Sequence, residues 1–383
     1  MRPLYFDYAA TTPVDDRVAK AMTDCLTFNG NFANPASRSH ALGWLAEEAV
    51  EEARNDVADL LGADSREIVW TSGATESNNL AIKGVADNYA PEACHIITTS
   101  IEHKAVIDPV KHLHSKGYQT TFVAPGSNGQ VSVESIAAEI TDKTRLISVM
   151  AVNNETGVIN PIAEIGKLCE QKGIFFHVDA AQAVGKIAVN VDEWKVTLLS
   201  LSAHKFYGPK GIGALYVRRR SPLELSAQIH GGGHERGMRS GTLATHQIVG
   251  IGTAAAILNE GFSDEHDRIE ALKERLWSGI ETLGDVIING KGSPISAGHL
   301  NVCFKGLDGE ALMMGVRNLA ISSGSACTSA TVEPSFVLKA MGCSDEDAHS
   351  SLRISLGRFT TESDVDQAIA SFSQAVNALR SAK

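Results

Sequence analysis

The chain has 383 residues, of which 43% are hydrophobic and 21% are charged, and its formal net charge at pH 7 is −11. This composition is typical of a globular protein of two or three domains, and the acidic excess argues against a surface that binds nucleic acid directly. No apolar run reaches the ~18 residues needed to span a membrane, and residues 1–13 lack the apolar region of a signal peptide, so we expect a cytoplasmic protein without a membrane partner.

Short β-rich runs alternate with helical patterns through the first two-thirds of the chain. Near-continuous apolar strands separated by amphipathic helices are typical of a mostly parallel sheet that is covered on both faces. The pattern therefore predicts a large α/β domain over about residues 15–258, with a seven-stranded sheet. The predicted strands are 67–73, 95–103, 118–125, 144–154, 174–182, 196–205 and 211–219, and the predicted helices are 76–90, 104–116, 132–140 and 161–172.

The pattern changes after residue 258, where a long polar helix is predicted over about 262–283. Strands and helices then follow in mixed order, which predicts a smaller α+β domain of residues 259–383 that residues 1–14 join. We predict strands near 285–290, 299–305 and 351–357, and helices at 308–319, near 334–341 and from about 361.

Polar residues stand where the predicted strands of the large domain end. Open α/β sheets bind their ligands at this edge. Gly73, Ala74 and Thr75 begin a helix there, and small residues at a helix start let backbone N–H groups approach an anion. Singly, each residue has an ordinary structural interpretation, such as an N-cap or a core histidine, but together they converge on one edge. The others are His103, Asn154, Asp179, Gln182, Ser202, His204 and Lys205.

This set of residues indicates a particular cofactor chemistry. A lysine can condense with an aldehyde, an aspartate can keep a pyridine nitrogen protonated, and a helix N-terminus can bind a phosphate. These are the contributions that a protein makes to a pyridoxal phosphate (PLP) site. A glycine-rich turn follows Lys205 at residues 208–213 and returns the chain into the sheet. No metal is expected, because no pair of the six cysteines has CxxC spacing.

The segment SSGSACTSA (322–330) carries a cysteine in an unusual context. Five of the six cysteines lie in apolar or helical patterns, where cysteine behaves as a small hydrophobic residue. Cys327 instead stands among Ser, Gly, Ala and Thr, which provide little packing and much conformational freedom. We expect a reactive thiol on a loop of about residues 322–333.

Ten motifs, in order, show that the chain resembles the cysteine desulfurases of the NifS/IscS type, within the aminotransferase-like fold of PLP enzymes (fold type I). The resemblance runs end to end and is closest to the housekeeping, long-loop subgroup that carries an SSGSACTS segment. The motifs are YFDYAATTP (5–13), GNFANPASRSHALG (30–43), TSGATESNNLAIKG (71–84), SIEHKAV (100–106), VNNETGVINPI (152–162), HVDAAQAVGK (177–186), SAHKFYGPKGIGALY (202–216), GGGHERGMRSGT (231–242), SSGSACTSA and LRISLGRFT (352–360).

The resemblance implies how the cofactor is held. Lys205 would bind it covalently, Asp179 would pair with the pyridine nitrogen, and His103 would stack on the ring and shuttle protons. Gln182 would donate to the phenolic oxygen. Thr242 would reach the phosphate in the site of a partner subunit, so the active unit would be a homodimer. The remaining cofactor-binding residues would be Ala74, Thr75, Asn154, Ser202 and His204.

The resemblance also implies the reaction, in which sulfur leaves L-cysteine and L-alanine remains. Arg353 and Asn154, with help from Asn34, would bind the substrate carboxylate, for which the planar guanidinium is well suited. Cys327 would accept the sulfur as a persulfide and pass it to an acceptor protein, which would be an iron–sulfur scaffold or another sulfur carrier. Only a small fraction of an ordinary thiol is ionised at pH 7, so both thiols would need activation.

Other interpretations stay open at this point. A selenocysteine lyase or another enzyme of the same fold would share most of the motifs, although a transaminase needs no nucleophilic cysteine. A catalytically silent scaffold is disfavoured by the joint presence of Lys205, Asp179, His103 and Cys327. Many housekeeping relatives continue past their last helix with a tail that helps to dock the scaffold protein, whereas this chain stops at NALRSAK. Iron–sulfur assembly, tRNA thiolation and DNA sulfur modification therefore all stay open as destinations of the sulfur.

Overall fold

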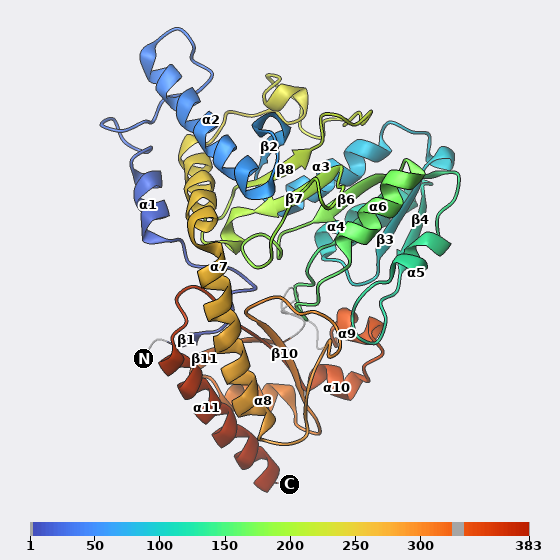
Figure 1. The fold of residues 1–383 in the computed structure, drawn as a ribbon, viewed down its shortest axis with the longest axis vertical. Coiled ribbons are helices and arrows are strands. Elements are labelled where there is room, and N and C mark those ends of the chain that lie inside the picture. The colour runs from blue at the N-terminus through green and yellow to red at the C-terminus, as the bar shows by residue number, and fades with distance from the viewer. Residues whose placement is uncertain (1–2, 324–332, 383) are drawn as a thin grey trace.

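The computed structural model describes residues 3–323 and 333–382. Its larger part is built on a seven-stranded sheet in the order β2-β8-β7-β6-β5-β3-β4 (Figure 1). Neighbouring strands are parallel, except that β8 is antiparallel to both β2 and β7. The predicted mostly parallel sheet of seven strands is confirmed. The strands are β2 (Ile68–Thr71), β3 (His95–Thr99), β4 (Gln119–Val123), β5 (Thr144–Met150), β6 (Phe175–Asp179), β7 (Leu198–Ser202) and β8 (Gly213–Val217).

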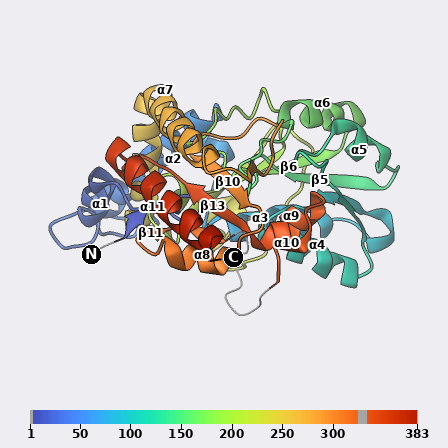
Figure 2. The ribbon, with the colours of Figure 1, turned by 90° about the horizontal axis from the view of Figure 1, so that it is seen from below.

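Helices cover both faces of this sheet. Successive side chains of each strand point to opposite faces, and both faces carry buried residues that the helices pack against. Ile96 and Leu146 pack under α3 and α4, whereas Ile97 and Ile147 pack on the side of α2 and α6. Figure 2 shows α6 on one side of the sheet and α4 on the other. These helices are α2 (Ala41–Leu61), α3 (Ala74–Ala86), α4 (Lys104–Ser115), α5 (Val133–Ala138) and α6 (Ile162–Lys172), and α1 (Asp16–Thr23) lies beside them near the N-terminus.

The smaller part holds a four-stranded antiparallel sheet in the order β12-β13-β10-β9. The N-terminal strand β1 pairs with β11, and Phe6 enters the core of this part, so the first residues join it as expected. Both chain ends lie here (Figure 1). The strands are β1 (Leu4–Tyr5), β9 (Val286–Ile288), β10 (His299–Phe304), β11 (Leu319–Ala320), β12 (Ser322–Ser323) and β13 (Ser351–Ser355), and the helices are α8 (Gly309–Gly315), α9 (Phe336–Ala340), α10 (Asp345–His349) and α11 (Glu362–Ser381).

One long helix, α7 (Thr245–Glu281), joins the two parts. Its residues up to Leu258 pack in the core of the larger part, and those from Ile269 onward pack in the core of the smaller part. The predicted start at residue 262 was wrong, because the helix begins 17 residues earlier, at Thr245. The division of the chain into domains at residue 258 stays a proposal, since it falls inside this helix.

Helices α1 and α2 were not predicted either. α2 packs closely against α7, and small residues line both sides of the contact. A Cβ atom on Gly252 would lie only 2.5 Å from the Cα of Ala53. Single 3-10 turns occupy Ser65–Glu67, Pro91–Ala93, Ala203–Lys205 and Glu235–Gly237. Within residues 3–323 and 333–382, none of the helices is both long and apolar enough to cross a membrane.

Candidate active site

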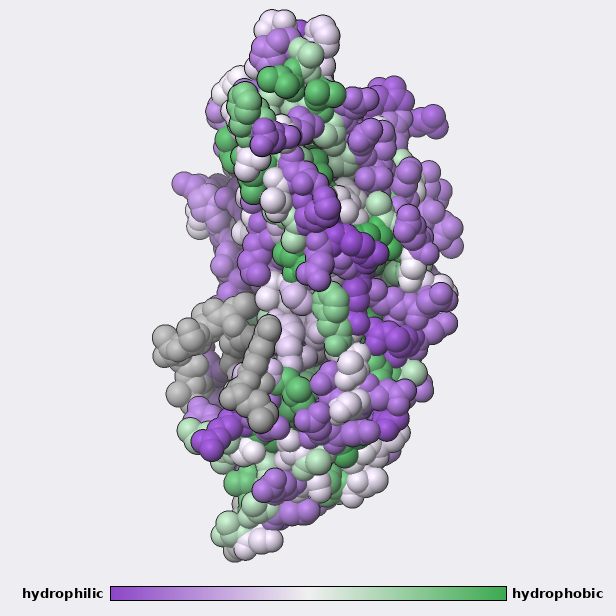
Figure 3. Space-filling view, turned by 90° about the vertical axis from the view of Figure 1, so that its left-hand side faces the viewer, coloured by the Kyte–Doolittle hydropathy of each residue, from purple (hydrophilic) through white to green (hydrophobic). Residues whose placement is uncertain are grey.

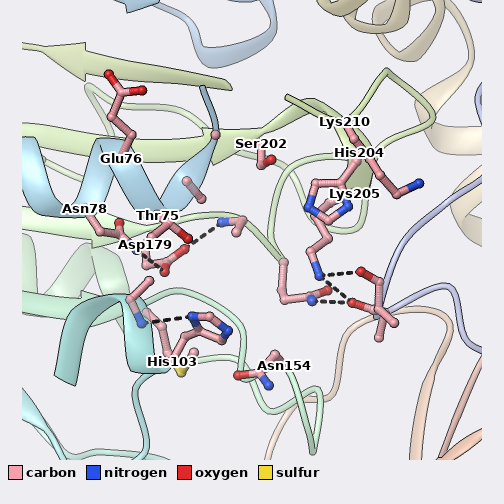
Figure 4. A pocket seen from close by; sticks show the side chains of 18 of the residues that line it. Thr75, Glu76, Asn78, His103, Asn154, Asp179, Ser202, His204, Lys205 and Lys210 are labelled. Carbon is pink, nitrogen blue, oxygen red and sulfur yellow. Dashed lines mark hydrogen bonds between the residues drawn. The ribbon is translucent and has the colours of Figure 1, made fainter. Parts of the chain in front are cut away.

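A cavity of about 540 Å³ opens where the carboxyl ends of the parallel strands face the smaller part of the molecule. Figure 4 shows side chains from several strand ends converging on it. Ligand cavities of a few hundred Å³ are usual for cofactors and small substrates. Ten of the predicted site residues line it, namely Ala74, Thr75, His103, Asn154, Asp179, Gln182, Ser202, His204, Lys205 and Arg353. Asn34 and Thr242 are not among its lining residues, and Cys327 lies outside the described part of the chain.

The start of α3 forms one end of the cavity. Its N-cap, Gly73, has no side chain, so the backbone N–H groups of the first turn are available to a ligand. The backbone of β8 comes unusually close, and a Cβ atom on Gly213 would lie 2.7 Å from the Cα of Gly73. Glycine at both positions therefore makes this approach possible. Together with the Ser202 and Thr75 side chains at the lining, this end is suited to an anion.

His204 lies at the same end and contributes a neutral ring. Burial lowers its pKa to about 4, and the nearby charge of Lys205 acts in the same direction. Its Nδ1 is 3.1 Å from Oγ1 of Thr11. At neutral pH the imidazole is therefore uncharged and can donate or accept a single hydrogen bond toward a ligand.

Asp179 ends β6 and is buried at the wall of the cavity. Its carboxylate accepts a hydrogen bond from Nδ2 of Asn78 at 2.7 Å and another from the backbone N–H of Ala181 at 2.9 Å. Two donors on one carboxylate hold it in place at the wall of the cavity. Asn78 belongs to the motif TSGATESNNLAIKG (71–84), but its side chain was not predicted to contact Asp179.

His103 is the N-cap of α4, and its ring Nδ1 accepts a hydrogen bond from the backbone N–H of Ala105 at 3.1 Å. This bond occupies one ring nitrogen and leaves Nε2 to face the cavity (Figure 4). Burial lowers the pKa of His103, and the charge of Asp179 opposes that shift. An uncharged ring at neutral pH can accept a proton from a bound substrate.

Lys205 lies just beyond β7, and its ammonium contacts the N-terminal segment of the chain. Nζ donates to the carbonyl oxygens of Ala9 and Ala10 at 2.7 and 2.9 Å. Nε2 of Gln182 also donates to the Ala9 carbonyl, at 2.7 Å. The motif YFDYAATTP therefore supplies backbone acceptors to the site, a role that its side chains did not reveal.

Arg353 reaches the cavity from β13 of the smaller part. Its Nη2 donates to Oδ1 of Asp7 at 2.8 Å, and its Nη1 donates to the backbone carbonyl of Asn154 at 3.0 Å. Its Nε is buried and makes no hydrogen bond within the described residues. The same oxygen of Asp7 accepts from Ser322 at 3.0 Å. Asp7 was not predicted at this position. Its carboxylate binds the guanidinium of Arg353, which was expected to bind the carboxylate of the substrate.

Comparison with known proteins identifies the family. The sequence matches the aminotransferase class-V family over residues 4–368. It is 57% identical over 378 residues to the cysteine desulfurase IscS of Shewanella sediminis, an alignment that covers 99% of this chain and 94% of that protein. The chain belongs to the cysteine desulfurases. The resemblance, the PLP-enzyme fold class and the desulfurase function expected from the sequence are therefore confirmed.

Further relatives and solved structures place the desulfurase in the same family. The cysteine desulfurase IscS of Proteus mirabilis is 57% identical, with the same coverage of both chains. A solved structure titled "NIFS-LIKE PROTEIN" has a TM-score of 0.90 at 37% identity and covers 98% of this chain and all of that one. A structure titled "SspA in complex with cysteine" has a TM-score of 0.84 at 40% identity and covers 94% of this chain and all of that one.

The residues of the desulfurase fit pyridoxal phosphate. The helix start at Gly73 offers N–H donors for a phosphate, the held carboxylate of Asp179 suits a protonated ring nitrogen, and Lys205 offers an amine. The unsatisfied Nε of Arg353 adds a donor at the end where a substrate carboxylate is expected. Donors, acceptor and amine are therefore distributed as this cofactor and an amino-acid substrate require.

Proposed function

We propose that this cysteine desulfurase works with pyridoxal phosphate bound covalently to Lys205 and moves the sulfur of L-cysteine onto Cys327. The observation that carries the proposal is the convergence of Lys205, Asp179 and His103 on one cavity, beside a helix start that is open to an anion. In a solution test, purified protein with the cofactor, L-cysteine and dithiothreitol should release alanine and sulfide in equal amounts. Production of pyruvate and ammonia instead of alanine would contradict the proposal.

Several residues of the chain would each hold a different part of the cofactor. When bound, the cofactor supplies an electron sink that weakens bonds around the substrate's α- and β-carbons. Asp179, held by Asn78 and Ala181, would keep the ring nitrogen protonated. Gln182 would donate to the phenolic oxygen. Ala74, Thr75, Asn154, Ser202 and His204 would contact the cofactor from the lining of the cavity.

Sulfur transfer needs a proton acceptor and a nucleophile. His103 would take the proton of the substrate thiol at Nε2, which the contact of Nδ1 with Ala105 leaves available. The thiolate of Cys327 attacks the substrate sulfur, so that an S–S bond forms while the bond between carbon and sulfur breaks. The carbon takes up a proton, and L-alanine and a protein persulfide result. No external oxidant or reductant is needed for this step.

The guanidinium of Arg353 would bind the substrate carboxylate, with Asn154 beside it. Arg353→Lys keeps the charge but loses the planar guanidinium and its unsatisfied Nε donor, so we expect KM for cysteine to rise about tenfold or more. The absorbance of the bound cofactor near 400 nm should stay unchanged, because the cofactor is held by other residues. Steady-state kinetics and absorbance spectra measure both. Arg275→Lys, at an exposed ion pair with Asp366, is a matched control.

An unchanged KM in Arg353→Lys would move the carboxylate site to another arginine. Arg239 is then the alternative, because it forms an ion pair with Glu76 at the lining of the cavity. The assignment of Asn34 to the same carboxylate rests on the resemblance alone. In this structure its side chain accepts from the backbone N–H of Ala36 and is exposed.

The proposal includes a homodimer, which an exposed apolar surface supports. This surface lies on the segment between α1 and α2 and on the first turn of α2, and we call it the arm patch. Figure 3 shows hydrophobic residues gathered at the upper end of the molecule, where this segment lies in Figure 1. Apolar patches of this kind on a soluble protein commonly mark protein interfaces. The arm patch consists of Leu26, Phe28, Phe32, Leu42, Trp44 and Leu45, of which Phe28 is 87% exposed.

We expect the wild type to sediment as a species of about twice the 40.7 kDa chain. Phe28→Asp places a charge in the arm patch and should shift the protein toward monomers, because a charge there opposes burial. Activity should fall with the dimer, since Thr242 would no longer reach the partner's site. Met314→Asp, which alters an exposed apolar residue on α8, should leave the dimer intact. An active monomer at assay concentration would contradict the proposal.

The sulfur acceptor and the compartment stay predictions. Curated relatives carry the name IscS, which supports delivery to iron–sulfur assembly, and tRNA thiolation and DNA sulfur modification are the other destinations. The cysteine complex of a structural neighbour supports L-cysteine as the substrate, with selenocysteine as the alternative. Capture of partners from the native cell, followed by mass spectrometry, would identify the acceptor. A cytoplasmic location is expected from the sequence.

A further inference from the structure

The loop that carries Thr242 is attached beside the start of α3 by two charged side chains. This loop spans residues 231–242 and comes before α7 in the chain. Glu235 and Arg239 attach it to β2 and α3, the two elements that Gly73 separates. The reaction described above uses neither of these side chains.

Glu235 makes the first attachment, within the protein core. Its carboxylate accepts from Nη1 and Nη2 of Arg54 at 2.8 and 3.0 Å, and from the backbone N–H of Trp70 at 2.8 Å. Glu235 and Arg54 are both buried. The backbone of Glu235 and Arg236 is left-handed, with φ of 48° and 57°, which is unfavourable for residues other than glycine. Buried contacts therefore hold the loop in a strained conformation and fix its position against β2.

Arg239 makes the second attachment, to Glu76 in the first turn of α3. Nε and Nη2 of Arg239 donate to Oε1 and Oε2 of Glu76 at 2.8 and 3.3 Å. Oε2 also accepts from the backbone N–H of Ser72 at 2.7 Å. Burial raises the pKa of Glu76, but the hydrogen bonds from Arg239 and Ser72 outweigh burial and lower it. The carboxylate of Glu76 is therefore charged at neutral pH.

Glu76 lies at the end of the cavity where an anion is expected. It lines the cavity together with Thr75 and Ser202. A carboxylate in the first turn stabilises a helix, but it also repels a second negative charge at the same helix end. Figure 4 shows the side chain of Glu76 directed away from Thr75 and Asp179. The ion pair with Arg239 therefore offsets the charge of Glu76 and keeps its carboxylate in this orientation.

We propose that Arg239 is a positioning residue for the cofactor phosphate, because its pairing with Glu76 neutralises a carboxylate that would otherwise repel a phosphate at the start of α3. Arg239 acts through Glu76 and needs no contact with the phosphate. The loop that would bring Thr242 to the partner's site would then also serve the site of its own subunit. The inference rests on the proposed function, since it takes pyridoxal phosphate as the cofactor.

The test compares pyridoxal phosphate with pyridoxal, which lacks the phosphate, as ligands of the full-length protein freed of cofactor with hydroxylamine and dialysed. Absorbance near 400 nm gives both dissociation constants, and borohydride trapping with mass spectrometry identifies the lysine. Arg239→Met should weaken binding of pyridoxal phosphate about tenfold and of pyridoxal less than twofold, because only the phosphate is repelled by the unpaired carboxylate. Adding Glu76→Gln to Arg239→Met should restore most of the affinity. Arg275→Met, at an exposed ion pair with Asp366, is the control and should bind as the wild type does.

Other roles of Arg239 predict a different pattern. If Arg239 only held the loop in place, or bound the phosphate itself, Glu76→Gln would not restore affinity to Arg239→Met, and that result overturns the inference. Equal losses for the two ligands, or an unchanged affinity of Arg239→Met for pyridoxal phosphate, also overturn it. If Arg239→Met does not fold, Arg239→Gln decides, because it keeps a donor for Glu76 without the charge and should lose affinity to the same extent. Wild-type affinity in Arg239→Gln overturns the inference as well. A wild type that captures no pyridoxal phosphate at Lys205 would instead contradict the proposed function.

Discussion

Lys205→Ala should abolish desulfurase activity, with a loss of more than about 10³-fold in kcat. The reason is that, within residues 3–323 and 333–382, Lys210 is the one other lysine that lines the cavity. Lys210 is exposed and lies in the glycine-rich turn, and Lys186 donates to Gln182 and is not among the lining residues of the cavity. The variant should also lose the absorbance near 400 nm that a covalently bound cofactor gives. Alanine and sulfide release in the presence of dithiothreitol, together with the spectrum, measures the effect.

The variant needs a check on folding, because Nζ of Lys205 donates to the carbonyls of Ala9 and Ala10. Gln182 still donates to the Ala9 carbonyl, so we expect only a modest loss of thermal stability. Lys210→Ala changes a lysine at the same cavity and should retain both activity and absorbance. Near-normal sulfide release by a folded Lys205→Ala protein would rule out Lys205 as the cofactor lysine.

Cys327→Ser should be equally inactive, for a different reason. A hydroxyl is protonated at neutral pH and cannot attack the substrate sulfur, so sulfur has no acceptor on the protein. The cofactor and its lysine are unchanged, so cysteine should still bind and still alter the absorbance spectrum. Alanine, sulfide and protein persulfide should all fail to form. Alanine production at the wild-type rate would show that sulfur leaves without this thiol.

Mass spectrometry of the wild type locates the persulfide directly. After L-cysteine and before reductant, the peptide that contains Cys327 should gain the mass of one sulfur atom, and the Ser variant should gain none. Cys303 and Cys343 serve as internal controls, because burial raises the pKa of both thiols and makes them poor nucleophiles. A mass gain on either of these peptides would contradict the assignment of Cys327.

The sheet could be predicted from the sequence because buried parallel strands are short, apolar and separated by amphipathic helices. The first half of α7 could not be predicted from the sequence. Its residues 245–258 are mostly small or apolar all round, and Gly252 is in contact with Ala53 of α2, so no polar face reveals a helix. The antiparallel direction of β8 was not predicted either, since the run of apolar residues gives no sign of strand direction.

Residues at strand ends could be placed at the cavity because parallel strands bring their carboxyl ends to one edge. Partners from elsewhere in the chain could not be placed. Asp7 contacts Arg353 only because β1 joins the smaller part of the molecule, and this pairing spans most of the chain. The acceptors at Ala9 and Ala10 are backbone atoms, which no residue type reveals.

The long helix α7 has a consequence for substrate choice. Lys205 belongs to the larger part and Arg353 to the smaller, and a single helix of 37 residues, roughly 55 Å long, packs in both cores. Because α7 packs in both cores, it limits how far Lys205 and Arg353 can separate. Every α-amino acid has the same distance between its amine and its carboxylate. A fixed separation between Lys205 and Arg353 therefore cannot distinguish one amino acid from another. Discrimination between cysteine and its homologues must therefore come from groups that contact the β-carbon and its substituent, with His103 foremost among those described.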